Sequence, residues 1–426
     1  MKLGCIVQYG LATYAGGDPL ATPPPSLFNP TNLDVRRWIV PMAATGVRWC
    51  LLTAKHQSGF CLWPTATTEY SVRSSPWKRG QGDLVEEFTS ACRKLQVLPG
   101  LSLSPGDMKF ACWSSLDPSG RRVLHGNREA YLPQFLGQLR ELLTGYGPLG
   151  VLWLDPELDP FAVGVKDPVT GRELGLEPAR AIHKLIRELQ PGCLIADGFA
   201  PDLRLEGSGG GRVRDPLWYP LAPGEGATQG FAPESQGWMI PVVRVPLRRS
   251  WFWTPGSLAD PGVAGSLLET YRNSVGRGAT LLLNMTPDPS GRIPREEEDR
   301  MRVTALESVN RYGFPVAARW NVSPTGAPPA VELDLGRDRE IDHVVLEEDL
   351  RQGQHIQGYE LQFLVGGAWQ RIASGSTVGS MRIEEFPAVR ASRVRVVVSR
   401  SAGTPSFLRI QAFNGSEAIR DTTPGE

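Results

Sequence analysis

The sequence predicts an α/β protein in which a (β/α)8-like barrel is followed by an all-β sandwich domain. Three observations lead to this fold class: apolar strand-like segments that alternate with amphipathic helices, a long stretch rich in Gly and Pro, and a C-terminal region of short alternating segments. The chain has 426 residues, more than one hydrophobic core usually serves. We therefore expect a barrel domain at 1–313 and a sandwich domain at 314–426.

The predicted barrel depends on strands without polar alternation, which are typical of parallel sheets covered by helices on both sides. The helices between them have one apolar face, as between Leu84 and Leu95. No glycine-rich phosphate loop follows any strand, which favours a barrel over an open nucleotide-binding sheet. The strand-like segments are 4–10, 47–54, 97–104, 150–155, 193–198 and 279–285.

Two further regions complete the predicted architecture. The stretch from Asp197 to Trp251 looks irregular and contains the run EGSGGGRVRD. Long irregular segments in compact domains are usually functional or disordered, and in a barrel such loops belong to the catalytic face. After residue 313, segments such as AVELDLG and SRVRVVVSR are separated by Gly, Pro and Ser turns, which indicates a β-sandwich.

Composition excludes several kinds of partner. Basic and acidic residues balance at 45 each, so no nucleic-acid surface is indicated, and no apolar run approaches the roughly 18 residues of a membrane span. The N-terminal MKLGCIVQYG enters a strand without a leader, so we expect a cytoplasmic protein, or a periplasmic or secreted one if a leader was removed. The six cysteines form no CxxC pair and are expected to be buried free thiols.

Polar residues at the carboxyl ends of barrel strands face the active site. Aromatic faces beside hydrogen-bonding groups suit a sugar, and a carboxylate that ends an apolar strand is costly unless it has a function. No cluster has metal-ligand spacing and no GxSxG elbow is present, so we expect neither a metal nor a cofactor. The candidates at these positions are His56, Gln57, Trp153, Asp155, Arg248 and Trp251.

Several segments resemble the α-L-fucosidases of glycoside hydrolase family 29. The block TAKHQSGFCLWPTATTEYSVRSSPW, with VLWLDP and YRNSVGRGATLLLNMTPDPSGRIP, is most similar to the branch that acts on α-1,3- and α-1,4-linked fucose. The tail, from VELDLG to VVVSRS, is similar to the discoidin-like (F5/8 type C) module that often follows in that branch. Such modules sometimes hold a structural calcium, although nothing in this sequence indicates one.

The resemblance implies a retaining exo-glycosidase that hydrolyses α-L-fucosyl linkages of oligosaccharides or glycoconjugates through a covalent intermediate. Asp155 would be the nucleophile, and His56, Trp153 and Trp251 would line the sugar subsite. The C-terminal module would be a candidate carbohydrate-binding domain. The remaining candidate sugar contacts are Gln8, Gln57, Trp63 and Arg248.

The sequence departs from the family at the second carboxyl. A gap-free comparison with the family's GPDVRW segment puts Gly209 where the acid/base glutamate is expected. Glu206 is our first candidate for that role, with Glu225 and Glu234 as rivals. Two glutamines replace histidines of the family, so a close relative of L-fucose such as L-galactose is an alternative glycone. A catalytically silent glycan-binding protein is the alternative from another class.

Overall fold

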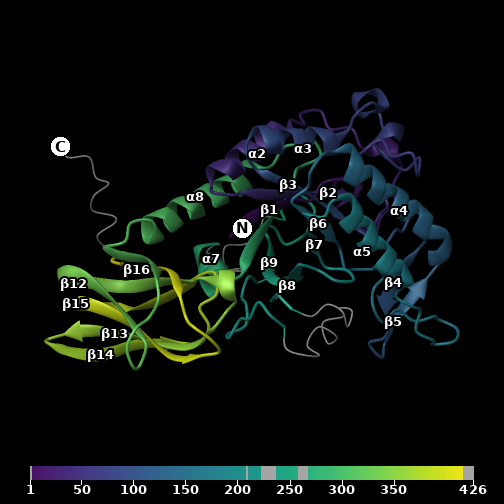
Figure 1. The fold of residues 1–426 in the computed structure, drawn as a ribbon. Coiled ribbons are helices and arrows are strands. Elements are labelled where there is room, and N and C mark those ends of the chain that lie inside the picture. The colour runs from purple at the N-terminus through teal and green to yellow at the C-terminus, as the bar shows by residue number, and fades with distance from the viewer. Residues whose placement is uncertain (1, 208–209, 222–236, 258–266, 416–426) are drawn as a thin grey trace, which may run out of the picture.

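The computed structural model describes residues 2–207, 210–221, 237–257 and 267–415. In these ranges, eight parallel strands close into a barrel in the order β1-β10-β9-β8-β7-β6-β3-β2, in which β1 pairs with both β10 and β2. Figure 1 shows this barrel beside an antiparallel C-terminal sheet, with α8 leading from one to the other. The predicted fold class is confirmed.

The barrel is built from short strands surrounded by helices. Its strands are β1 (Leu3–Val7), β2 (Trp49–Lys55), β3 (Leu98–Leu103), β6 (Val151–Leu154), β7 (Leu194–Ala196), β8 (Leu203–Leu205), β9 (Ile240–Pro246) and β10 (Thr280–Met285). The α-helices are α1 (Leu11–Tyr14), α2 (Val35–Ala44), α3 (Leu84–Lys94), α4 (Arg128–Gly145), α5 (Glu177–Leu189), α7 (Leu267–Ser274) and α8 (Arg295–Tyr312). A hairpin of β4 (Trp113–Leu116) and β5 (Arg122–His125) lies between β3 and α4, and the 3₁₀ turns are η1 (Pro25–Leu27), η2 (Val72–Ser74), η3 (Trp77–Gly80), η4 (Val275–Arg277) and η5 (Leu350–Gln352).

All six predicted strands are present, but the stretch from Asp197 to Trp251 is less irregular than its composition indicates. It contains β8 and β9, which close the barrel between β7 and β10. β8 has only three residues, too few for a visible pattern, and β9 carries two prolines and an arginine that interrupt its apolar run. The expectation of one continuous irregular segment is therefore wrong for these two strands.

Local sequence explains where the main helices begin. The Asp83 carboxylate accepts a hydrogen bond from the Glu86 N–H at 2.9 Å, and the Asn127 side chain accepts one from the Ala130 N–H at 3.0 Å. Such N-cap contacts satisfy amide groups that have no partner inside the helix. Each helix then turns its apolar face to the barrel, where α3 buries Leu84, Val85 and Phe88 among others.

Alternation along the strands separates the lumen of the barrel from the core beneath the helices. Two indole rings fill much of the lumen, and a Cβ on Gly4 would lie 2.2 Å from the ring of Trp49, so only glycine fits there. Because the lumen of the barrel is packed with apolar side chains, polar chemistry is confined to the carboxyl ends of the strands. The lumen cluster is Ile6, Trp49, Leu51, Val151, Trp153, Ala196, Leu203, Val242 and Leu282.

The C-terminal domain is a β-sandwich with its own core of aliphatic and aromatic residues. Its antiparallel strands run in the order β11-β16-β12-β15-β13-β14. Breaks in register between Asp334 and Arg339 and between Ile341 and His343 interrupt the long β12, and such bulges bend a strand. The strands are β11 (Ala317–Val322), β12 (Ala330–Glu348), β13 (Ile356–Val365), β14 (Ala368–Gly375), β15 (Arg382–Ser401) and β16 (Phe407–Phe413).

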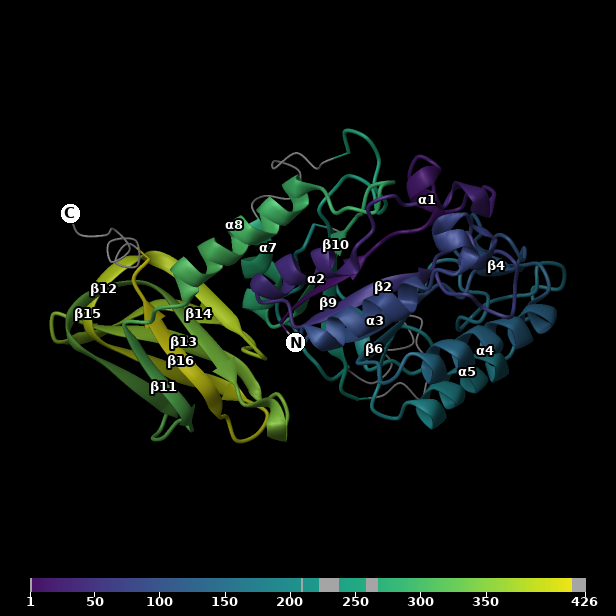
Figure 2. The ribbon, with the colours of Figure 1, turned by 90° about the horizontal axis from the view of Figure 1, so that it is seen from above.

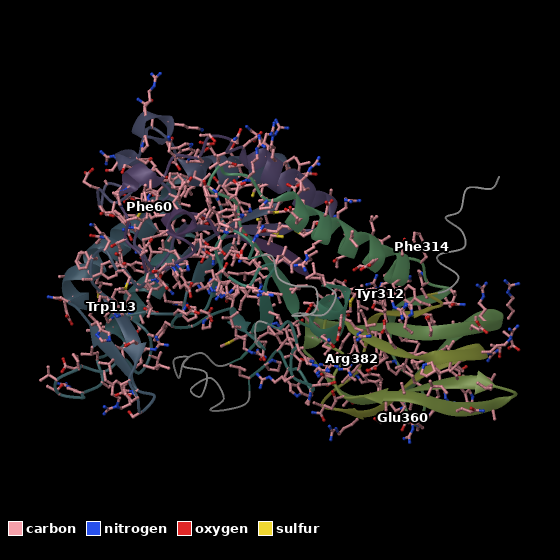
Figure 3. All side chains as sticks on the ribbon, turned by 180° about the vertical axis from the view of Figure 1, so that it is seen from behind. Phe60, Trp113, Tyr312, Phe314, Glu360 and Arg382 are labelled. Carbon is pink, nitrogen blue, oxygen red and sulfur yellow. The ribbon has the colours of Figure 1, made fainter. Side chains whose placement is uncertain are left out.

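The contact between barrel and sandwich combines apolar packing with a set of polar bonds. Figure 2 shows α7 and α8 on the side of the barrel that faces the sandwich, and Figure 3 places Tyr312 and Arg382 near this contact. The Arg311 guanidinium and the Tyr312 hydroxyl donate to the Glu385 carboxylate at 2.8 Å and 3.0 Å, and Arg382 pairs with Asp215 at 2.9 Å. The buried Gln354 side chain donates to the Leu217 carbonyl oxygen at 3.0 Å and accepts from the Tyr219 N–H at 2.9 Å.

All six cysteines are buried and free, as predicted. Across the described ranges, none of the helices combines the length and the apolar character that crossing a membrane requires.

We expect Gln354→Ala to lower the free energy of unfolding by about 2 to 4 kcal/mol, because it leaves two buried backbone groups without partners. Thermal or urea unfolding measures the change. Gln352→Ala is the matched control, since that side chain is exposed in the same loop. Equal stability of both variants would show that the contact does not hold the two parts together.

Candidate active site

Asp155 lies at the carboxyl-terminal face of the barrel. It follows β6 directly and is 3% exposed. Its Oδ1 accepts a hydrogen bond from the Glu157 N–H at 3.2 Å, and its Oδ2 lies 3.7 Å from His56 Nε2. The ends of β6 and β2 therefore bring a carboxylate and an imidazole together, as the sequence predicts for strand-end residues.

His56 is held as a neutral ring. Its imidazole packs edge-on against Phe252, with ring centroids 4.9 Å apart. Burial lowers the pKa of His56, against the opposite effect of the Asp155 carboxylate. An uncharged imidazole offers one donor and one acceptor, and its buried Nδ1 has no hydrogen-bond partner among the described residues.

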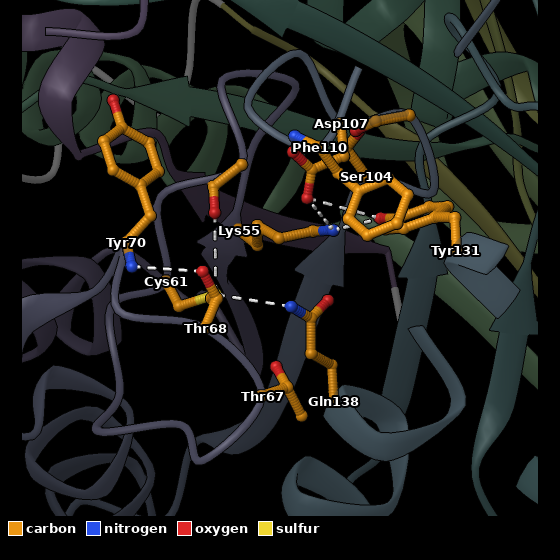
Figure 4. A network of polar contacts seen from close by, with 12 residues as sticks. Lys55, Cys61, Thr67, Thr68, Tyr70, Ser104, Asp107, Phe110, Tyr131 and Gln138 are labelled. Atoms are coloured by element: carbon orange, nitrogen blue, oxygen red, sulfur yellow. Dashed lines mark hydrogen bonds and ion pairs between the residues drawn. The ribbon is translucent and has the colours of Figure 1, made fainter. Parts of the chain in front are cut away.

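A buried polar network fixes the end of β2 just before His56 (Figure 4). The Lys55 ammonium donates to the Tyr131 hydroxyl at 2.6 Å and to Asp107 Oδ2 at 3.3 Å. The Lys55 carbonyl oxygen accepts from the Ser104 N–H at 2.9 Å. Strand β2, the loop after β3 and helix α4 are thereby joined below the site.

Arg244 lies between two indole rings at the mouth of the barrel. Its guanidinium carbon is 4.6 Å from the Trp251 ring centroid and 5.6 Å from that of Trp153. Arg244 follows Ile240 and Val242 in the alternation of β9, so it faces the lumen. Recognising β9 in the sequence would have identified this cation as a site residue.

Buried polar atoms without partners are concentrated at this face. The atoms are neighbours: Arg244 influences the pKa of both His56 and Asp197, and the Asn284 amide donates to the Trp251 carbonyl oxygen at 2.9 Å. Buried polar groups are normally hydrogen-bonded, so such a cluster indicates a site that binds several hydroxyl groups. The atoms are His56 Nδ1, Trp153 Nε1, Asp197 Oδ2, Arg244 Nη1 and Asn284 Oδ1.

Two predicted glutamines lie at the edge of this cluster. Gln8 follows β1, and its Oε1 accepts a hydrogen bond from the Thr53 hydroxyl at 2.8 Å. Gln57 is buried beside His56, and its Nε2 donates to Glu157 Oε2 at 3.1 Å. Both side chains are therefore oriented by protein contacts before any ligand arrives.

Two other predicted contacts have partners elsewhere. The Trp63 indole N–H donates to Glu141 Oε2 of α4 at 2.7 Å, because the chain reverses after Gly59 and carries Trp63 into the outer core. Arg248 is 5% exposed and pairs with the fully buried Glu297 of α8. The described structure thus gives Trp63 and Arg248 contacts typical of packing and of fold closure.

Glu206 also faces away from the lumen. Leu203 and Leu205 of β8 pack inward, so alternation turns Arg204 and Glu206 outward. Glu206 Oε1 accepts from Arg204 Nε at 2.9 Å and from Arg214 Nη2 at 2.5 Å. The two rivals, Glu225 and Glu234, lie outside the described residues.

The described part of the chain contains no group of three His, Cys, Asp or Glu side chains placed to hold a metal ion. What the barrel mouth presents is a buried carboxylate, a neutral imidazole, two indoles and unpartnered polar atoms. A parallel barrel with this face has the class features of a (β/α)8 glycoside hydrolase, in which carboxylates act on a bound sugar.

Comparison with known proteins identifies the family. The sequence profile of the α-L-fucosidases matches residues 18–210. Alpha-L-fucosidase 1 of Arabidopsis thaliana is 31% identical, over 94% of this chain and 82% of that protein. This chain belongs to the α-L-fucosidases, glycoside hydrolase family 29.

Solved structures agree with this assignment. A glycoside hydrolase 29 family member from an unknown rumen bacterium is 28% identical with a TM-score of 0.79, covering 97% of this chain and 75% of that chain. A Ruminococcus gnavus GH29 fucosidase in complex with fucose shares the fold, with a TM-score of 0.79 at 21% identity over 98% and 93% of the two chains.

We expect Arg248→Ala to lower the free energy of unfolding by about 3 to 5 kcal/mol, because it leaves Glu297 buried without its counter-ion. Chemical denaturation measures the loss of stability. Arg249→Ala is the control variant, because the Arg249 side chain is exposed. If the Arg248→Ala protein is as stable as wild type but binds the sugar more weakly, the result would support Arg248 as a sugar contact.

Proposed function

We propose that this protein is a retaining exo-glycosidase that hydrolyses terminal α-L-fucosyl linkages with Asp155 as the nucleophile. The observation that carries the proposal is the buried Asp155 carboxylate, which ends β6 next to Trp153 and 3.7 Å from His56. Membership of the α-L-fucosidase family supports the same reaction.

The geometry supports Asp155 as a nucleophile that the backbone orients. Asp155 Oδ1 accepts a hydrogen bond from the backbone N–H of Glu157, while Oδ2 lies 3.7 Å from Nε2 of the His56 ring, beyond hydrogen-bond distance. An oriented carboxylate can attack the anomeric carbon and form a glycosyl ester, which water then hydrolyses. A second carboxyl is required to give the leaving oxygen its proton.

The unpartnered polar atoms support a neutral, hydroxyl-rich glycone. Trp153 and Trp251 offer apolar faces, and Arg244 and His56 offer hydrogen-bonding groups around them. This suits L-fucose, with L-galactose as the close relative that differs by one hydroxyl. The α-1,3- and α-1,4-linked branch remains our proposal for the linkage, as does glycan binding for the sandwich domain, which would then resemble a discoidin-like module.

Asp155→Asn should lower kcat for an activated aryl α-L-fucoside by at least about 10³-fold, because the amide cannot form the ester intermediate. Melting temperature and circular dichroism should stay near wild type, since the side chains have the same shape. Wild-type turnover by the variant would contradict the nucleophile assignment. Absence of turnover in the wild-type protein, with fucose binding intact, would favour the glycan-binding alternative.

His56→Ala should raise the Kd for L-fucose about 5- to 10-fold, because one hydrogen bond of about 1 kcal/mol is lost. Calorimetric titration of the Asp155→Asn background measures affinity without turnover. His183→Ala on α5 is the control, since that ring lies on the helical layer. A large fall in melting temperature with unchanged affinity would identify His56 as a packing residue.

A further inference from the structure

Asp197 occupies the strand end next to that of Asp155. β7 pairs with β6 in parallel, with Ala196 opposite Trp153, so Asp197 follows one strand end and Asp155 the other. Neighbouring strands lie about 4.8 Å apart, which puts the two carboxyl-bearing residues side by side at the barrel mouth. The two strands even end alike, VLWLD and CLIAD.

The backbone at Asp197 is locally unusual. Its φ is +58°, in the left-handed region that few residues other than glycine adopt. Simple alternation would turn its side chain outward, since Ile195 packs in the outer core and Ala196 in the lumen. Such conformations are frequent at functional sites, where the surrounding structure sustains their cost.

The Asp197 carboxyl lies close enough to the lumen-facing Trp153 for a side-chain hydrogen bond from that indole to lower its pKa. Asp197 is 4% exposed, and its Oδ2 is buried outside hydrogen-bond geometry among the described residues. The charged and titratable groups that act on it are Arg244 of β9, Asp155 after β6 and Asp159 in the following loop. Burial raises the pKa of Asp197 to about 8, against the lowering effect of Arg244 and with a further rise from Asp155. At neutral pH the group therefore holds a proton.

The other buried carboxylates nearby are already engaged. Glu206 is bound by Arg204 and Arg214 on the outer side of β8. Asp159 Oδ1 accepts the Phe161 N–H at 2.7 Å. Of the carboxyl groups that the structure describes, only that of Asp197 has a buried oxygen outside hydrogen-bond geometry. The Trp153 indole beside it is a donor and not an acceptor, so it does not compete with a ligand oxygen for the proton of Asp197.

On the basis of the retaining mechanism above, we propose that Asp197 is the general acid/base of this enzyme, in place of the glutamate that the sequence lacks at Gly209. A proton donor must hold its proton, lie beside the nucleophile and have no competing acceptor. Asp197 meets these three requirements together, whereas Glu206 does not.

With these roles, hydrolysis proceeds in two steps. Asp155 attacks the anomeric carbon and forms an ester bond, while the bond from that carbon to the leaving oxygen breaks. The electron pair goes to the leaving oxygen, which takes the proton of Asp197. Water next attacks the anomeric carbon, Asp197 accepts its proton, and the ester breaks to return the Asp155 carboxylate. Arg244 lowers the pKa of Asp197 and so stabilises the carboxylate present between the two steps.

The test compares Asp197→Asn with Asp159→Asn, a buried aspartate of the same region whose burial raises its pKa to about 7. Each variant is assayed on a fucosyl disaccharide and on an aryl fucoside with an acidic leaving group. We expect Asp197→Asn to lower kcat/KM for the disaccharide by about 10²- to 10⁴-fold and that for the aryl fucoside far less. Azide should restore kcat on the aryl fucoside and give fucosyl azide, while Asp159→Asn should behave as wild type.

The pH profile supplies an independent readout that needs no variant. Wild-type kcat/KM for the disaccharide should fall above about pH 8, where the acid loses its proton, and Asp197→Asn should lose that limb. An unchanged disaccharide rate in Asp197→Asn, or no alkaline limb in the wild type, would overturn the assignment. The same loss and azide rescue in Glu206→Gln or Glu157→Gln would move the role to that residue.

The same assays distinguish an error in the retaining mechanism from an error in the acid/base assignment. If the wild type cleaves neither substrate, or if Asp155→Asn cleaves both, the retaining mechanism itself is wrong. If the wild type is active and Asp155→Asn is not, the result for Asp197→Asn bears on the acid/base alone.

Discussion

The catalytic face depends on one buried ammonium group. Lys55 is fully buried, and a charge in such a place is tolerated only when its partners are well placed. It has them in the Asp107 carboxylate and the Tyr131 hydroxyl, and its ammonium lies 5.3 Å from the ring centroids of Tyr131 and Phe135. Because these partners come from the loop after β3 and from α4, the next residue, His56, starts from a fixed backbone.

The charges above this anchor are arranged around Arg244. Its guanidinium lies near Trp153 and Trp251 and acts on the pKa of both His56 and Asp197, so one cation influences groups from β2 and β7. Burial favours the uncharged forms of His56 and Asp197, because it lowers the pKa of the imidazole and raises the pKa of the carboxyl. A neutral sugar can enter such a site without a large electrostatic penalty.

The sequence predicts strand ends better than it predicts orientation. The positions of Asp155 and His56 at strand ends are predictable, because an apolar strand that stops at a polar residue is a local pattern and a parallel barrel brings such ends together. Asp197 ends its strand in the same way, but its left-handed φ, which departs from strand alternation, is not visible in the sequence. The sequence predicts Trp63 as a sugar contact, whereas the structure places its indole in the outer core, because the chain reversal after Gly59 decides which side of the barrel the ring occupies. Arg244 and Arg248 show the same limit, because Arg244 lies within β9 and faces the lumen, whereas Arg248 lies beyond the end of β9 and pairs with Glu297 of α8.

The hydrogen bonds of Gln354 to Leu217 and Tyr219 limit how freely the C-terminal domain can be exchanged in evolution. The same segment gives its Trp218 and Tyr219 carbonyl oxygens to Arg204 of β8, so the sandwich, the connecting segment and a barrel strand form one chain of contacts. A C-terminal domain acquired from another protein would lack the matching side chain and would leave this part of the barrel unsupported. The two domains are therefore expected to be inherited together.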